Sequence, residues 1–174
     1  GCNLRNYLCT AVGTMNALEK LATELGTALK AHSFVMALAE SCTGGMVAQT
    51  ITSIAGSSAW FDRGFVTYSN AAKIEMLGVS AETLEKFGAV SEEIAIEMAL
   101  GALKNSHAKI TGSITGIAGP DGGTTDKPVG TVCFAWAGLD MPVSVTTRHL
   151  QGNREEVRQQ VTAVLMAGLI ERLS

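Results

Sequence analysis

Hydrophobic residues repeat with the spacing of an amphipathic helix at both ends of the chain. The first such segment begins at Met15, and its apolar face consists of Leu18, Leu21, Leu25 and Leu29. In the last segment, Asn153 and Glu156 have the spacing of a capping box. The apolar face after this box comprises Val157, Val161, Val164, Leu165 and Leu169. We therefore predict a helix at each end that buries one face.

Between these helices, short apolar runs alternate with helical segments. Strands are predicted over residues 34–39, 60–68, 110–117 and 143–150, and over the alternating run Val132, Phe134 and Trp136. The last two strands are separated by a turn at residues 140–142, which predicts an antiparallel hairpin.

The remaining helices are predicted from periodicity and from their end signals. One begins after residue 45 and stops before Gly56, and another covers residues 70–77. Ser80 and Ser91 are placed as N-caps of two more helices. The alternation of helices and strands predicts an α/β fold, with a mixed sheet between two helical layers in a three-layer α/β/α arrangement.

The composition indicates one globular domain and excludes several classes of partner. The chain has 174 residues, 47% of them hydrophobic and 17% charged, and its formal net charge is −3. No Lys/Arg cluster forms a basic stripe, so we expect no nucleic-acid partner. No apolar run approaches the roughly 18 residues of a membrane span, so we expect no membrane partner.

The cysteines and histidines carry no metal-binding pattern. The four cysteines stand at positions 2, 9, 42 and 133, and none of their spacings suits a zinc site. We expect no metal and no cofactor. A reduced, cytoplasmic protein is the simplest account of these cysteines.

Residues 1–14, GCNLRNYLCTAVGT, differ in pattern from the remainder of the chain. They show no clear period and none of the features of a signal peptide. We predict a single domain over residues 15–174, with residues 1–14 as a leader or a cloning-derived extension. A genuine short extension is the alternative.

The stretch AESCTGGMVAQTI, residues 39–51, joins a predicted strand to a predicted helix through a glycine turn. The glycines let the backbone turn sharply and approach a ligand. Free N–H groups at a helix start favour an anion or a developing oxyanion. Ser41 would lie at the mouth of such a site. An ordinary capped strand–helix turn without function accounts for the same pattern.

Two further stretches carry candidate chemistry. Lys73 lies in the first turns of the predicted helix 70–77, where a cation is unfavourable and its pKa would be lowered. A solvated surface lysine is the alternative. Residues 115–131, TGIAGPDGGTTDKPVGT, form a long glycine-rich loop between strands, which is typical of a binding element rather than a simple connection.

These stretches belong to four motifs that follow one another along the chain. They are ESCTGG at 40–45, GSSAWFDRGFVTYSNAAK at 56–73, GAVSEE at 88–93 and TGIAGPDGGTTDKPVGTV at 115–132. Together they resemble the CinA C-terminal domain family, over the chain from about residue 15 to its end. The resemblance implies a CinA C-terminal-domain-like fold. For the stand-alone, PncC-type members it implies hydrolysis of the carboxamide of nicotinamide mononucleotide to nicotinate mononucleotide and ammonia, in pyridine nucleotide salvage.

The resemblance also implies roles for single residues. Ser41 would be the nucleophile, Lys73 its base and Tyr68 a proton relay or orienting group. The substrate-binding groups would be the backbone around Thr43, Gly44 and Gly45, the loop residues Thr115, Gly116 and Gly119, and Arg154 as a phosphate partner. A thiol is intrinsically the better nucleophile, so the residues alone leave Cys42 open as an alternative to Ser41, and the resemblance favours the serine.

Three functions are consistent with this pattern. The first is the nucleotide amidohydrolase, with a small-molecule nucleotide as its partner. The second is an amidase that acts on another small metabolite. The third is a non-catalytic nucleotide-binding module, against which the presence of a base lysine argues. The many small and apolar helix faces also permit a homodimer.

Overall fold

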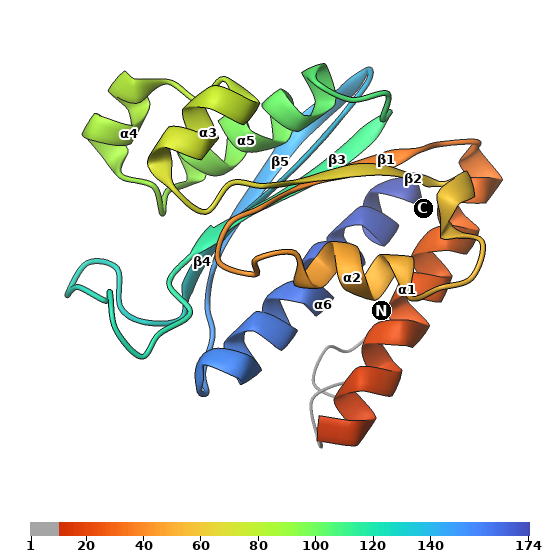
Figure 1. The fold of residues 1–174 in the computed structure, drawn as a ribbon, viewed down its shortest axis with the longest axis horizontal. Coiled ribbons are helices and arrows are strands. Elements are labelled where there is room, and N and C mark those ends of the chain that lie inside the picture. Colours follow the sequence, from red (N-terminus) through yellow and green to blue (C-terminus); the bar gives the residue numbers. More distant parts are fainter. Residues whose placement is uncertain (1–10) are drawn as a thin grey trace.

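A single mixed sheet forms the centre of the molecule in the computed structural model, which describes residues 11–174 and the side chains of residues 17–174 (Figure 1). Its strands are β1 (Met36–Glu40), β2 (Phe61–Val66), β3 (Ile110–Gly116), β4 (Thr131–Gly138) and β5 (Met141–His149). They lie in the order β2-β1-β3-β4-β5. Strand β1 is parallel to β2 and β3, whereas β4 is antiparallel to β3 and β5. The predicted mixed sheet and the antiparallel hairpin are confirmed.

Two helical layers cover the sheet, as Figure 1 shows. The helices are α1 (Ala11–His32), α2 (Met46–Thr52), α3 (Asn70–Leu77), α4 (Ala81–Phe87), α5 (Glu92–Lys104) and α6 (Arg154–Leu173). Helices α1, α2 and α6 pack together on one face, and α3, α4 and α5 pack on the other. The three-layer α/β/α fold predicted from the sequence is therefore confirmed.

The main core lies between the sheet and the layer of α1, α2 and α6. The predicted apolar faces of the first and last helices are buried there, against large side chains of the central strands such as Ile114, Phe134 and Trp136. The opposite side of the sheet is lined by small residues, and Ala95 and Ala99 of α5 pack close to Ala135 of β4. Helix α5 can therefore approach the sheet closely.

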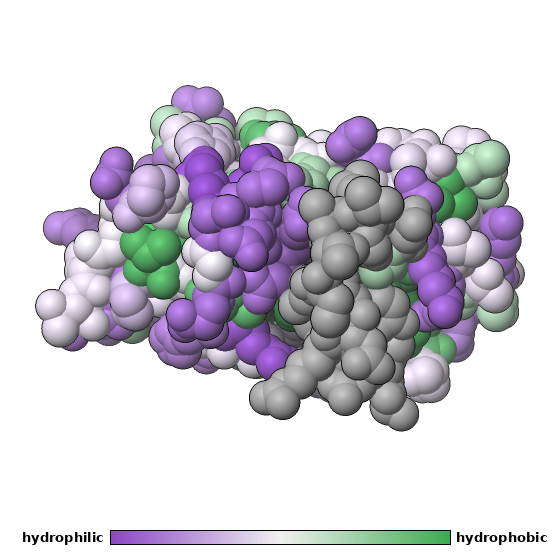
Figure 2. All heavy atoms as spheres, turned by 90° about the horizontal axis from the view of Figure 1, so that it is seen from below, coloured by the Kyte–Doolittle hydropathy of each residue, from purple (hydrophilic) through white to green (hydrophobic). Residues whose placement is uncertain are grey.

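The outer surface of the α1 and α6 layer is mainly hydrophilic where it is drawn in colour. Figure 2 views this side, and the hydrophobic residues there are scattered among polar ones. No helix of residues 11–174 is long and apolar enough to cross a membrane.

Local capping signals give the helix starts that the sequence predicted. The side chains of Ser80, Ser91 and Asn153 each accept a hydrogen bond from a backbone N–H in the first turn of their helix. Asn153 and Glu156 form the complete capping box. These caps use side chain and backbone only a few residues apart, so the sequence specifies them directly.

Several boundaries differ from the prediction. Helix α1 begins at Ala11 rather than Met15, and residues 1–10 of the predicted leader lie outside the described residues. Helix α2 ends at Thr52, and Gly56, with φ 85°, precedes a 3₁₀ turn (Ser57–Ala59) instead of closing the helix. Strand β5 already begins at Met141, because Asp140 takes the left-handed conformation and tightens the hairpin turn.

Candidate active site

A cavity opens where the three parallel strands end. Since β1, β2 and β3 run in the same direction, their carboxyl ends meet at one edge of the sheet, where α/β folds commonly bind ligands. The cavity measures about 280 Å³. Of the predicted site residues, its lining includes Ser41, Tyr68, Lys73, Thr115, Gly116, Gly119 and Arg154. Segments far apart in the sequence are thus brought together as predicted.

Lys73 and Ser41 are in direct contact at the bottom of this site. The Nζ of Lys73 donates to the Oγ of Ser41 at 3.0 Å and to the carbonyl oxygen of Thr67 at 2.8 Å. The Ser69 hydroxyl caps α3 by accepting from the N–H of Ala72, which fixes the helix that carries the lysine. One lysine therefore links the end of β1 to the segment after β2.

Lys73 is buried, with 1% of its surface exposed. Burial disfavours the charged ammonium form and lowers the pKa of Lys73 below 10.5, while the neighbouring Cys42 opposes this shift. No Asp or Glu of residues 17–174 forms an ion pair with it. The predicted lowering of the pKa is confirmed in direction, with burial as its main cause. A neutral amine held against a hydroxyl is suited to accept a proton from it.

The turn after Ser41 differs from the expectation of free N–H groups. Gly44 and Gly45 have φ of 58° and 106°, and these positive values explain why glycines stand here. The N–H of Gly44 donates to the carbonyl of Ser41, and that of Gly45 donates to the carboxylate of Glu40. Thr43, Gly44 and Gly45 do not line the cavity. The prediction that these glycine N–H groups are free to hold a substrate anion is therefore wrong.

Cys42 lies beside Ser41 and also lines the cavity. Burial raises the pKa of its thiol to about 11, so the thiol is protonated at neutral pH and is a weak nucleophile. Within residues 11–174, its backbone N–H donates to no other residue. The geometry thus favours Ser41 as the nucleophile, with the N–H of the next residue left open for an oxyanion.

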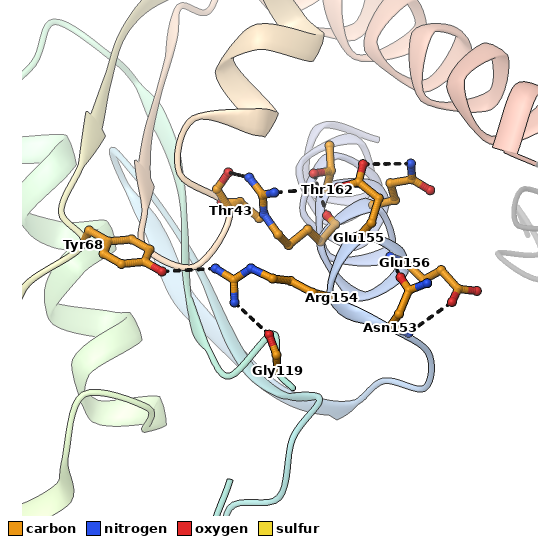
Figure 3. A network of polar contacts seen from close by, with 10 residues as sticks. Thr43, Tyr68, Gly119, Asn153, Arg154, Glu155, Glu156 and Thr162 are labelled. Carbon is orange, nitrogen blue, oxygen red and sulfur yellow. Dashed lines mark hydrogen bonds and ion pairs between the residues drawn. The ribbon is translucent and has the colours of Figure 1, made fainter. Parts of the chain in front are cut away.

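Arg154 bridges the rim of the cavity, as Figure 3 shows. Its Nη1 donates to the carbonyl of Gly119 at 2.9 Å, and its Nη2 donates to the hydroxyl of Tyr68 at 3.1 Å. Tyr68 is 62% exposed and makes no hydrogen bond to Ser41 or Lys73. Its position supports a role in orienting the rim, and it does not provide a direct proton relay between nucleophile and base.

The other predicted residues hold the walls of the cavity. The Thr115 hydroxyl donates to the carbonyl of Ala89 at 2.7 Å, which ties the end of β3 to the segment before α5. A Cβ at Gly116 would lie 2.7 Å from a methyl group of Val132, so the strand pair requires glycine there.

Sequence reasoning did not single out Asn70, Asp121 or Glu40. Asn70 and Asp121 line the cavity, and Glu40 lies buried behind it. Their positions in the sequence could have indicated them, because each belongs to one of the four motifs. The described residues contain no group of three or more His, Cys, Asp or Glu side chains placed to hold a metal.

Comparison with known proteins gives matches over nearly the whole domain. The CinA C-terminal domain matches residues 18–173. The nicotinamide-nucleotide amidohydrolase PncC of Enterobacter agglomerans is 59% identical over 143 residues, which cover 82% of this chain and 87% of that protein. The protein of the same name from Escherichia coli K12 is 54% identical over 157 residues, covering 90% and 94%.

Solved structures show the same similarity. The competence/damage inducible protein CihA of Agrobacterium tumefaciens superposes with a TM-score of 0.86 at 45% identity, over 88% of this chain and 94% of that one. A CinA superfamily protein of Klebsiella pneumoniae gives a TM-score of 0.86 at 39% identity, over 90% and 97%.

Proposed function

The chain belongs to the CinA C-terminal domain family, and from this premise we propose that it is an amidohydrolase that converts nicotinamide mononucleotide to nicotinate mononucleotide and ammonia. The observation that carries the proposal is the contact between Lys73 and Ser41 in a cavity that Arg154 also lines. The names of the similar proteins supply the substrate.

The reaction begins with proton transfer between these two residues. Neutral Lys73 accepts the proton of the Ser41 hydroxyl as Ser41 Oγ attacks the carboxamide carbon. In this proposal the backbone N–H of Cys42 stabilises the oxyanion of the tetrahedral intermediate. The Lys73 ammonium then returns a proton to the amide nitrogen, which leaves as ammonia, and an ester with Ser41 is formed.

Water completes the cycle. It attacks the ester with Lys73 again as the base, which releases the carboxylate product and regenerates the serine. The carbonyl of Thr67, which accepts from the same Nζ, keeps the amine directed at Ser41 through both steps. Arg154, at the rim, is the cation proposed to bind the substrate phosphate.

Two features foreseen from the sequence stay proposals. A cytoplasmic location is supported by the free thiols of Cys42 and Cys133, both of which are buried. A homodimer is compatible with the apolar side chains that lie exposed in the domain.

The proposal is tested by incubating the purified protein with nicotinamide mononucleotide and following ammonia and the acid product. We expect turnover by the wild type and by Cys42→Ala, and none above background by Ser41→Ala. Circular dichroism of each variant controls for folding. Ammonia release by Ser41→Ala together with its loss in Cys42→Ala would transfer the role to the thiol. Turnover of other amides but not of the mononucleotide would show that the proposed substrate is wrong and that the proposed mechanism can still apply.

A further inference from the structure

Glu40 is a fully buried carboxylate that the proposed reaction does not use. It is the last residue of β1, directly before Ser41, and none of its surface is exposed. A buried charge is costly unless hydrogen bonds compensate it. The role of this carboxylate therefore depends on the groups that surround it.

Four donors converge on the Glu40 carboxylate, all from the turn and helix after Ser41. Oε1 accepts from the Thr43 hydroxyl at 2.6 Å and from the N–H groups of Gly45 and Val47 at 3.2 and 3.1 Å. Oε2 accepts from the N–H of Ala48 at 3.0 Å. The carboxylate thus occupies the start of α2 and joins this helix to the turn that follows the nucleophile.

The backbone of Glu40 is linked to the base as well. Its carbonyl accepts from the N–H of Thr67, and the carbonyl of Thr67 accepts from Nζ of Lys73. The residue therefore lies between two short chains of hydrogen bonds, one to the Ser41 turn through its side chain and one to Lys73 through its backbone.

The direction of the carboxylate also matters for the base. Glu40 is next to Ser41 in the chain, yet its oxygens bind the start of α2 and make no ion pair with Lys73. A carboxylate paired with Lys73 would stabilise the ammonium form and remove the base.

We propose that Glu40 is a positioning residue that sets the Ser41–Lys73 contact and keeps its own charge directed away from the lysine. The inference rests on the proposed Ser41/Lys73 chemistry. The competing explanation is that Glu40 only stabilises the fold by capping α2. The two explanations predict different activities for a Glu40 variant under conditions in which it is fully folded.

The informative variant is Glu40→Gln, which keeps the shape and one acceptor oxygen. Its NH₂ group cannot accept from the N–H of Ala48, so the start of α2 must shift. The matched control is Glu97→Gln on α5, whose carboxylate accepts from the backbone N–H of Ser80. Neither of these two residues lines the cavity. Both variants lose a carboxylate that holds a helix start.

Three quantities are measured below the melting temperature of each protein: kcat, KM for nicotinamide mononucleotide, and the rate at which a fluorophosphonate probe modifies Ser41. For Glu40→Gln we expect kcat and the modification rate to fall together by about 10²-fold, because a small misplacement of reacting groups has a cost of this size. KM should change little. Glu97→Gln should keep all three values.

Wild-type kcat and modification rate in folded Glu40→Gln would overturn the proposal, as would an equal loss in Glu97→Gln. If Glu40→Gln does not fold, Thr43→Val gives the same comparison, since it removes one donor to Oε1, and unchanged modification of Ser41 in that variant would overturn the proposal. The probe reports on Ser41 without the substrate. A wild type that is modified quickly but does not hydrolyse the mononucleotide would therefore contradict the proposed function and leave the test of Glu40 valid.

Discussion

The chemistry of a lysine depends on how much water reaches its amino group and on which acceptors surround it. Lys73 is enclosed, its acceptors are a hydroxyl and a carbonyl, and no carboxylate of residues 17–174 pairs with it. Both acceptors are neutral, so they do not offset the cost of burying a charge. At the scale of the residue, this environment turns an ordinary cation into a candidate base.

The first prediction concerns the pH dependence of the rate. The active form of Lys73 is the neutral amine, so kcat/KM should rise with pH along a limb whose pKa lies below 10.5. Lys73→Arg keeps the charge but cannot deprotonate, so it should lose kcat by several orders of magnitude, while KM changes less. Rates of ammonia release across a pH series provide the measurement. Lys104→Arg, at the end of α5, is the control, and near-normal turnover with the same limb in Lys73→Arg would assign the base to another group.

At the scale of the element, the capped start of α6 lies at the rim of the cavity. Its capping box, formed by Asn153 and Glu156, encloses Arg154, the first residue of the helix. Arg154 reaches Tyr68 and Gly119 at the rim of the cavity. One turn later, Arg158 donates to the carbonyl of Thr43 in the turn after Ser41. The start of one helix therefore holds both the rim of the cavity and the turn after Ser41.

The second prediction tests this connection with Asn153→Ala. Loss of the cap should lower the free energy of unfolding by about 1 kcal/mol. Because the first turn then frays, Arg154 should be less ordered and KM should rise more than kcat falls. Ser80→Ala removes the equivalent cap of α4 and should lose similar stability without any change in KM. Urea unfolding measures the loss of stability, and steady-state kinetics measure KM and kcat. Equal KM values in both variants would show that the cap of α6 does not affect substrate binding.

At the scale of the whole molecule, the site exists only when all three layers are assembled. The ends of the parallel strands provide Ser41 and the carbonyl of Thr67, the layer of α3 provides Lys73, and the opposite layer provides Arg154 through α6. Folding of the complete domain is what encloses the lysine. The stability of the domain must therefore depend on the charge of Lys73.

The third prediction concerns this linkage. In the unfolded chain Lys73 has an ordinary pKa near 10.4, whereas in the folded domain its pKa is lowered. Between these two values the unfolded chain binds more protons, so the free energy of unfolding should rise with pH, by at most about 1.4 kcal/mol per pH unit. Below the lowered pKa the folded domain bears the full cost of the buried charge.

Comparison with Lys73→Met isolates the contribution of this residue, since all other titrating groups are shared. The difference in unfolding free energy between wild type and Lys73→Met should shift in favour of the wild type as the pH rises through this window. Urea unfolding at a series of pH values gives the difference. A difference that stays constant with pH would show that Lys73 has the same pKa in the folded and the unfolded state.

Features that depend on neighbours in the sequence could be predicted from the sequence alone. Helix α3 has the predicted limits, and Ser80, Ser91 and Asn153 cap helices as expected, because the partners in each cap lie within one turn. The buried faces of the end helices reflect a 3.6-residue period. Two of the motifs contain Ser41 and Lys73, and the family resemblance added Arg154 at the start of the last helix. The cavity brings these three residues together.

Features that depend on distant partners required the tertiary structure. The acceptors of Lys73, the bond between Tyr68 and Arg154, and the direction of the Glu40 carboxylate are set by how β1, α2, α3 and α6 pack. The sequence left the start of α2 open to a substrate anion, whereas in the folded chain Glu40 fills it. The physical reason is that a hydrogen bond joins whichever donor and acceptor the fold brings within reach, and for these residues only the assembled sheet and its two helical layers determine that choice.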